Sequence, residues 1–244
     1  MTKTQTSQEN SSVRKKICVS SELTYILAII LLSLAVATLT AANFGISMIV
    51  APAYLLSLKI GVITFGQAEY IMQAGVFIVL CLVLKKFRPI FLASFATCLI
   101  YGAVLDLWRL IPCFNPAVTE PGSIALPIRI PMFIIGMLLT AFSVTLFLKT
   151  YLYPQVYDFF VKAVSLKYKI KVSVFKTGVD LTLLLASTVM TFCFFGKLVG
   201  LNWGTLVMAT LNGTIIGFFS NQLDRLFEFK PVFKKFSSYF ELDQ

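Results

Sequence analysis

Four polar side chains interrupt apolar stretches of this sequence and carry groups that bind ions or solutes: Glu69, Gln73, Asp180 and Asn212. Gln73 follows Glu69 by four residues, so in a helix the two side chains share one face. If that helix lies in lipid, a carboxylate there is costly, so Glu69 should face the protein interior and bind a proton, a coupling cation or a cationic substrate. The structural alternative places Glu69 near the outer surface, reached by water and tied to a helix start capped by Thr64.

Two other carboxylates have basic residues close by in the sequence. Lys176 precedes Asp180 by four residues, and such a pair can neutralise itself on one helix face; the alternative is that Asp180 belongs to a binding site. Arg109 follows Asp106 by three residues, which indicates an ion pair at the outer end of a helix. Asn212 lies deep in an apolar stretch and either cross-links helices by hydrogen bonds or contacts a substrate.

The sequence does not support catalysis or metal chemistry. It has no histidine, which removes the commonest general base and the commonest metal ligand. No GxSxG, HExxH or Gly-rich phosphate loop is present. The cysteines form no CxxC pair and are odd in number, which argues against a disulfide framework or a zinc site. We therefore expect no enzymatic activity, no cofactor and no bound metal.

The composition predicts that most of the chain lies in lipid. Of 244 residues, 58% are hydrophobic and 13% are charged, and the mean hydropathy is +0.86. A soluble protein has about 45–50% apolar and about 25% charged residues, so this chain lacks the polar side chains to cover a water-facing surface. The net charge of +10 comes from cations in short clusters between apolar runs, which is typical of topology signals rather than nucleic-acid binding.

Six apolar stretches have the length of about 20 residues that a membrane-spanning helix needs. They predict an all-α, polytopic bundle of six transmembrane helices: Leu23–Asn43, Thr64–Leu84, Pro89–Leu110, Ile128–Leu148, Phe175–Phe195 and Gly204–Gln222. We expect a single transmembrane domain over residues 23–225, with halves at about 23–111 and 128–222. A disordered cytoplasmic arm (1–22) precedes it and a cytoplasmic tail (226–244) follows it.

Basic residues indicate how the chain crosses the membrane. If the six spans cross the membrane in turn, 17 of the 21 Lys and Arg residues lie on the same side of the membrane as the N-terminus, and four lie on the opposite side. This bias follows the positive-inside rule and predicts a multi-pass plasma-membrane protein with both termini in the cytoplasm. The four residues on the outer side are Lys59, Arg109, Arg129 and Lys197.

The sequence also matches itself at an offset of 111 residues. Small residues spaced by four then superpose, and Glu69 falls on Asp180. Because each half has three helices, the second half enters the membrane from the opposite side, as in the inverted-topology repeats of transporters. The alternative is chance, since this spacing is common in membrane helices. The predicted helix-packing residues are Ser94, Cys98 and Gly102 in the first half, and Thr205, Ala209, Gly213 and Gly217 in the second.

Each half has a further segment between its first and second helices. Residues 44–59 are apolar but interrupted by Gly45 and Pro52, so this segment is either re-entrant or interfacial. Residues 153–171 interleave apolar residues with lysines and an aspartate. That pattern predicts an amphipathic helix lying in the cytoplasmic interface.

Several motifs carry a family resemblance. Residues 204–213 read GTxxxAxxxG, residues 102–106 read GxxxD, and the broken segment FGISMIVAPAYLLS precedes TFGQAEY at the start of the second span. From about residue 23 to 225 the sequence resembles the YczE/YyaS/YitT family of bacterial inner-membrane proteins. It departs from that family where Ala93 and Ser94 replace a GT pair and where Thr214 replaces a proline. The resemblance implies a polytopic plasma-membrane protein and supplies no catalytic residue.

Together these patterns predict a permease or transport component for an unknown small solute, with a site between the halves built from Glu69, Gln73, Asp180 and Asn212. Its expected partners are the lipid bilayer and the solute, with no nucleic acid, and either a second copy of the chain or transporter subunits. One alternative is the substrate-binding subunit of an energy-coupling-factor transporter, which would dock through the small residues Ser33, Ala37 and Ala41. Another is a membrane scaffold or accessory factor that transports nothing.

Overall fold

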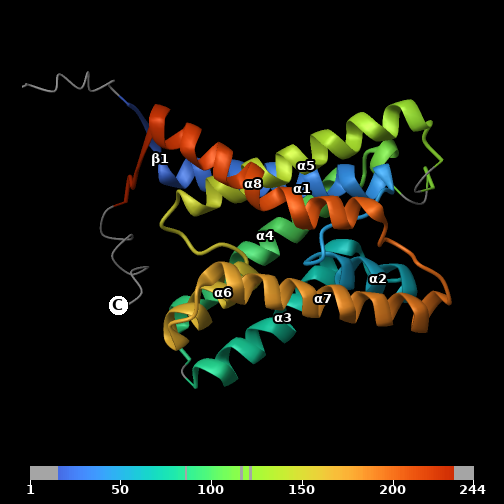
Figure 1. Ribbon diagram of the computed structural model, residues 1–244, viewed down its shortest axis with the longest axis horizontal. Coiled ribbons are helices and arrows are strands. Elements are labelled where there is room, and N and C mark those ends of the chain that lie inside the picture. The colour runs from blue at the N-terminus through green and yellow to red at the C-terminus, as the bar shows by residue number, and fades with distance from the viewer. Residues whose placement is uncertain (1–15, 86, 116–117, 121–122, 234–244) are drawn as a thin grey trace, which may run out of the picture.

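The computed structural model describes residues 16–85, 87–115, 118–120 and 123–233 (Figure 1). These residues form an all-α fold with two short strands, so the predicted class is confirmed. The helices are α1 (Ser21–Ala42), α2 (Ala51–Ile60), α3 (Phe65–Leu84), α4 (Leu92–Trp108), α5 (Leu126–Leu148), α6 (Val156–Tyr168), α7 (Val172–Phe195) and α8 (Trp203–Leu226). The strands are β1 (Ile17–Ser20) and β2 (Phe227–Lys230), and two 3₁₀ turns cover Pro89–Phe91 and Pro112–Phe114.

Five of the helices are long and apolar enough to cross a membrane: α1, α3, α5, α7 and α8. The sixth stretch predicted to span, α4, is a shorter apolar helix of 17 residues, which covers about 25 Å at a rise of about 1.5 Å per residue. Many large apolar side chains of the bundle point outward, among them Leu181 and Leu185 on α7. So large an apolar surface requires lipid around it. The chain is a multi-pass helical membrane protein.

The start of α3 follows a signal in the sequence. The hydroxyl of Thr64 accepts the N–H of Gln67 at 3.1 Å, and the Gln67 side chain accepts the N–H of Thr64 at 3.0 Å. This reciprocal arrangement satisfies two N–H groups that the first helical turn leaves without partners. Thr64 is therefore the N-cap that the sequence predicts.

The centre of the bundle is the contact between α1 and α5, with α4 packed against α1 and α8 packed against α5. Gly136 permits this close approach, because a Cβ atom there would lie only 2.8 Å from Cγ of Leu39. On α1, Ala35 and Ala37 are fully buried. The other long helices lie farther out: α3 packs against α4 and α6, and α7 against α2 and α6 (Figure 1).

The two short helices are buried in this bundle. In α6, Val156 and Phe159 are fully buried, because the helix packs against both α3 and α7. The predicted helix is therefore present, and it packs against protein, because its exposed side chains are confined to Lys162 and the last turn. Its place in the cytoplasmic interface stays a prediction. In the first half, α2 contacts α3 and α7, and Leu55 is fully buried. The segment 44–59 thus ends in a helix packed inside the bundle.

The two ends of the described chain meet in a parallel sheet, in which Ile17 pairs with Phe227 and Ser20 with Lys230. Strand β1 leads into α1 and β2 follows α8, so the first long helix begins on the side of the bundle where the last one ends. The predicted disordered arm (1–22) is ordered in β1 and the start of α1, because β2 supplies the hydrogen bonds that β1 alone lacks. Residues 1–15 lie outside the described part.

Candidate functional site

A cluster of three polar side chains is buried beside α3. Glu69 and Gln73 lie on one face of α3 as their spacing predicts, and Gln155 immediately precedes α6; their exposed fractions are 3%, 4% and 8%. The Nε2 of Gln73 donates to Oε2 of Glu69 at 3.2 Å and to Oε1 of Gln155 at 2.8 Å. The N–H of Val156 donates to Oε1 of Gln73 at 3.1 Å. The amide of Gln73 therefore joins α3 to the first residues of α6.

The Glu69 carboxyl forms no ion pair with any Lys or Arg of the described residues. Its Oε1 is buried without a hydrogen-bond partner, and so is Nε2 of Gln155. A carboxylate isolated in an apolar interior is unstable, so Glu69 is stable there either as the neutral acid or beside a bound cation. The cluster can thus hold a proton or bind a cation. In the described ranges no three His, Cys, Asp or Glu side chains come together as a metal site.

The second predicted acid, Asp180 on α7, accepts a hydrogen bond from the hydroxyl of Tyr157 at 2.5 Å. Lys176 forms its ion pair with Asp158, at 3.5 Å, so the predicted pair of Lys176 with Asp180 is wrong. Lys176 also lies 5.1 Å from the centre of the Tyr157 ring. Because α6 packs against α7, Asp158 and Tyr157 of α6 become the partners of Lys176 and Asp180. They replace the pairing of Lys176 with Asp180 that spacing along α7 predicts.

The first residues of α6 therefore connect the helices that carry the two predicted acids. Gln155 bonds to α3 and Tyr157 bonds to α7. Sequence analysis missed both residues, because a single Gln or Tyr forms no motif; the available signal was Pro154, which favours a helix start just after it. Asn212 lies on α8, which packs against α5. Its Oδ1 is buried without a partner in the described residues, and no contact described joins it to the other three.

The acid at the C-terminal end of α4 serves as a cap for α3. Asp106 accepts hydrogen bonds from the hydroxyl of Thr64 at 2.5 Å and from the N–H of Gly66 at 2.9 Å. A carboxylate is stabilised at a helix N-terminus, where N–H groups and the positive end of the helix dipole meet. The ion pair predicted between Asp106 and Arg109 is not formed within the described structure, because both oxygens of Asp106 point toward α3.

The model of one protein family, described as a family of unknown function (DUF6198), matches residues 19–221. The chain belongs to the DUF6198 family. The match covers α1 to α7, most of α8, and the polar residues around Glu69 and Asp180. No curated protein and no solved structure matches the chain.

In this DUF6198 protein the small residues of α4 pack against α3. A Cβ atom on Gly102 would lie 2.3 Å from Cε1 of Tyr70, and Sγ of Cys98 lies 4.0 Å from the backbone oxygen of Glu69. Ser94 is fully buried, and its hydroxyl donates to Phe91 O at 2.7 Å. Close packing of α3 on α4 therefore depends on the absence of larger side chains along this face.

The corresponding residues of α8 have different surroundings. Thr205 is buried, and its hydroxyl donates to Ile46 O at 3.0 Å. Ala209, Gly213 and Gly217 are exposed, and a Cβ atom on either glycine would meet nothing within 4 Å. Only the first residue of the predicted packing face on α8 is therefore covered by the described chain.

Proposed function

We propose that this DUF6198 protein is a permease or transport component for a small solute in the bacterial cytoplasmic membrane, and that Glu69 binds a proton or a cation during transport. One observation carries the proposal: Glu69 is buried in a helix able to span the membrane, with one carboxyl oxygen unbonded and no cationic partner among the described residues. Ionisable residues inside membrane helices usually belong to ion, proton or substrate pathways.

Matching helix contacts support an inverted repeat of four helices in each half. The contact of α1 with α4 in the first half corresponds to that of α5 with α8 in the second. Across the halves, the contact of α3 with α6 corresponds to that of α7 with α2. The contact of α2 with α3 has its counterpart in that of α6 with α7. Such repeats are typical of transporters in which one part of the molecule moves against another around a central site.

The pairing of β1 with β2 supports six crossings. A chain whose two ends lie on one side of the membrane crosses it an even number of times, and five long helices plus α4 make six. Lys167 at the end of α6 bonds to Val83 O and Leu84 O at the end of α3, so the lysine-rich link after α3 and the end of α6 share a side. By the positive-inside rule this side is the cytoplasm.

A difference between the halves supports two states. In the first half α3 packs on α4 through Gly66 and Gly102, at the outer end. In the second half α7 packs on α2 and α6 and not closely on α8 (Figure 1), where Gly213 stays uncovered. We propose that this arrangement is the inward-facing state. In the outward-facing state α7 closes on α8 and α3 separates from α4.

Current measurements on proteoliposomes test the proposal. The wild-type protein, Glu69→Gln and a control, Glu120→Gln in an exposed outer loop, receive panels of small anions and cations with and without a pH gradient. We expect a solute-dependent current or a solute-dependent pH change inside the vesicles for the wild type and the control, and neither for Glu69→Gln. Equal currents in all three proteins would exclude a role of Glu69 in transport.

A non-transporting scaffold is the second candidate, and the close packing of α1 on α5 favours it. The two helices that would face a path between the halves meet through Gly136 and buried alanines of α1. Absence of both current and internal pH change for every solute would support this function. The energy-coupling-factor alternative loses its predicted docking face, because Ser33, Ala37 and Ala41 are buried within the chain. The resemblance to the YczE/YyaS/YitT family stays a prediction.

A further inference from the structure

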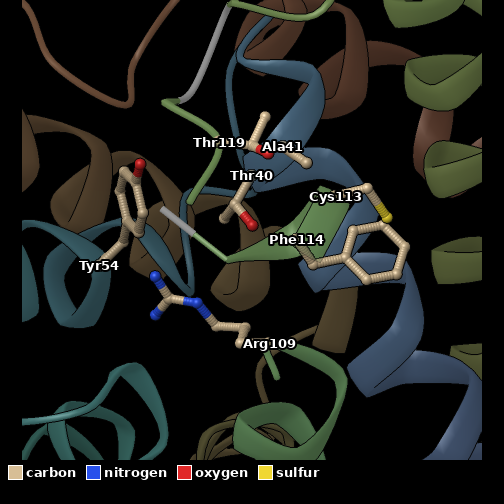
Figure 2. Close-up of a pocket in the computed structure, with 7 residues that line it drawn as sticks. All are labelled: Thr40, Ala41, Tyr54, Arg109, Cys113, Phe114 and Thr119. Carbon is tan, nitrogen blue, oxygen red and sulfur yellow. The ribbon is translucent and has the colours of Figure 1, made fainter. Parts of the chain in front are cut away.

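A small pocket lies at the outer end of the bundle, away from the Glu69 cluster. Its lining comes from the end of α1, from α2, from the end of α4 and from the loop that follows α4: Thr40, Ala41, Tyr54, Arg109, Cys113, Phe114 and Thr119. Figure 2 shows the guanidinium of Arg109 reaching into the space beside Tyr54 and Thr40. The cavity volume is about 10 Å³, about the room that a single water requires.

Arg109 forms no close ion pair in the described part of the chain, and the Asp106 carboxylate acts on its charge only from a distance. Its Nε is buried without a hydrogen bond, and no described carboxylate forms an ion pair with it. The nearest acid in the sequence, Asp106, accepts its hydrogen bonds from α3 instead. The guanidinium lies 5.3 Å from the centre of the Phe65 ring, a contact that stabilises the cation but satisfies none of its N–H donors.

The other outer arginine shows how a guanidinium is satisfied in this protein. Arg129 donates from Nε to Ala42 O at 2.7 Å and from Nη2 to Asn43 O at 3.0 Å, and it lies 4.4 Å from the centre of the Phe44 ring. Both arginines therefore lie against a phenylalanine, but among the described residues only Arg129 has hydrogen-bond acceptors. A partly buried arginine without acceptors is costly, unless a ligand supplies them.

We propose that the Arg109 pocket binds a small monocarboxylate. The planar fork of a guanidinium matches a carboxylate in two parallel hydrogen bonds, and the Tyr54 side chain faces the same space. Ala41 and Phe114 line the same pocket. Because its free volume matches about one water, binding of even acetate requires the lining side chains to move apart, and a bulkier acid requires a larger movement. As the outer binding step of the proposed permease this inference rests on that function; binding itself requires no transport.

Thermal unfolding of the purified full-length protein tests the site with acetate as the probe. Acetate replaces gluconate, a bulky carboxylate, at constant ionic strength. We expect a saturable rise in melting temperature for the wild type and for Lys197→Gln, an exposed outer cation, and no rise for Arg109→Gln. Arg109→Lys keeps the charge but loses the fork, and we expect about tenfold weaker acetate binding, equivalent to about 1.4 kcal/mol.

Two results would overturn the inference: an equal acetate response in the wild type and both Arg109 variants, or no acetate response in a folded wild-type protein. If Arg109→Gln does not fold, the comparison of Arg109→Lys with Lys197→Gln decides. Acetate binding without any current and without acetate uptake above that of protein-free liposomes would support the site and reject the permease. Current that Arg109→Lys leaves unchanged, together with an unaltered acetate response, would reject the site and keep the permease.

Discussion

The Nζ of Lys167 lies 2.8 Å from the backbone oxygen of Val83, in the last turn of α3. The equivalent contact joins Lys59 to Phe194 O, at 3.2 Å, in the last turn of α7. Val83 and Phe194 are 111 residues apart, the offset at which the sequence matches itself. In each case a short helix of one half supplies a cation to a helix end of the other half, where the helix dipole favours positive charge.

We predict that these two lysines lie on opposite sides of the membrane. In a cysteine-free background, a membrane-impermeant maleimide should label Lys59→Cys in intact cells and Lys167→Cys only in inverted vesicles. An inverted repeat requires this result, because a half-turn about an axis in the membrane plane exchanges the two faces. Labelling of both positions from one side would refute the repeat.

The two equivalent glycines should differ in their tolerance of alanine. Gly102→Ala places a Cβ atom 2.3 Å from the Tyr70 ring, and such overpacking costs about 1–3 kcal/mol. Gly213→Ala meets nothing within 4 Å and should leave stability unchanged or raise it by up to about 1 kcal/mol, because alanine favours helix. Melting temperatures in one detergent give the comparison. Equal losses at both positions would mean that α7 already covers α8 in solution.

Closure of α7 on α8 is measurable by cross-linking. Leu181 is the equivalent of Tyr70 at the offset of 111, and it is 58% exposed. If the outward-facing state is visited, the double variant Leu181→Cys/Gly213→Cys should form a disulfide in proteoliposomes under mild oxidation. Leu181→Cys/Leu211→Cys is the matched control, because Leu211 projects from nearly the opposite side of α8. Equal cross-linking of both pairs would indicate random collision.

The amides of Gln73 and Gln155 should be coupled in stability. Replacing either by leucine removes their 2.8 Å hydrogen bond and leaves a buried partner unsatisfied, which costs about 1–3 kcal/mol. The double variant should be less destabilised than the sum of the single variants, with a coupling of about 0.5–3 kcal/mol. Thermal or denaturant unfolding of the wild type, the two single variants and the double variant gives the double-mutant cycle. Strict additivity would show that the bond contributes nothing.

Glu22 should hold the end of the described chain in place. Its carboxylate accepts the N–H of Val232 at 2.9 Å, the N–H of Phe233 at 3.1 Å and the hydroxyl of Tyr151 at 2.9 Å. Burial and the bond to Glu22 raise the pKa of Tyr151 to about 12, so this phenol keeps its proton at neutral pH. We predict that Glu22→Ala lowers stability by about 1–3 kcal/mol and exposes the segment after α8 to proteases.

The control for Glu22 is Glu228→Gln, on β2. Glu228 is exposed and pairs with Lys230 at 3.1 Å, and such surface pairs contribute about 0–1 kcal/mol. Melting temperature and limited proteolysis should therefore change little in this variant. Similar proteolysis in both variants would show that the sheet, and not Glu22, holds the segment.

Two misassigned partners show where reasoning from spacing stops. Spacing along α7 pairs Lys176 with Asp180, yet Lys176 lies beside Asp158 because α6 packs against that face of α7. Spacing at the end of α4 pairs Asp106 with Arg109, yet Asp106 caps α3. In both cases a neighbouring helix offers donors or charges that the linear sequence does not bring together.

The sequence alone determined that lipid surrounds the bundle and where its helices lie, because apolar composition, length and capping are local properties of a segment. Only the tertiary structure decided the partners of the polar groups. The start of α6 packs against both α3 and α7, which brings Gln155 to Gln73 on α3 and Tyr157 to Asp180 on α7. No local pattern encodes how deeply a short helix enters the bundle, since that depth is set by the packing of all its neighbours.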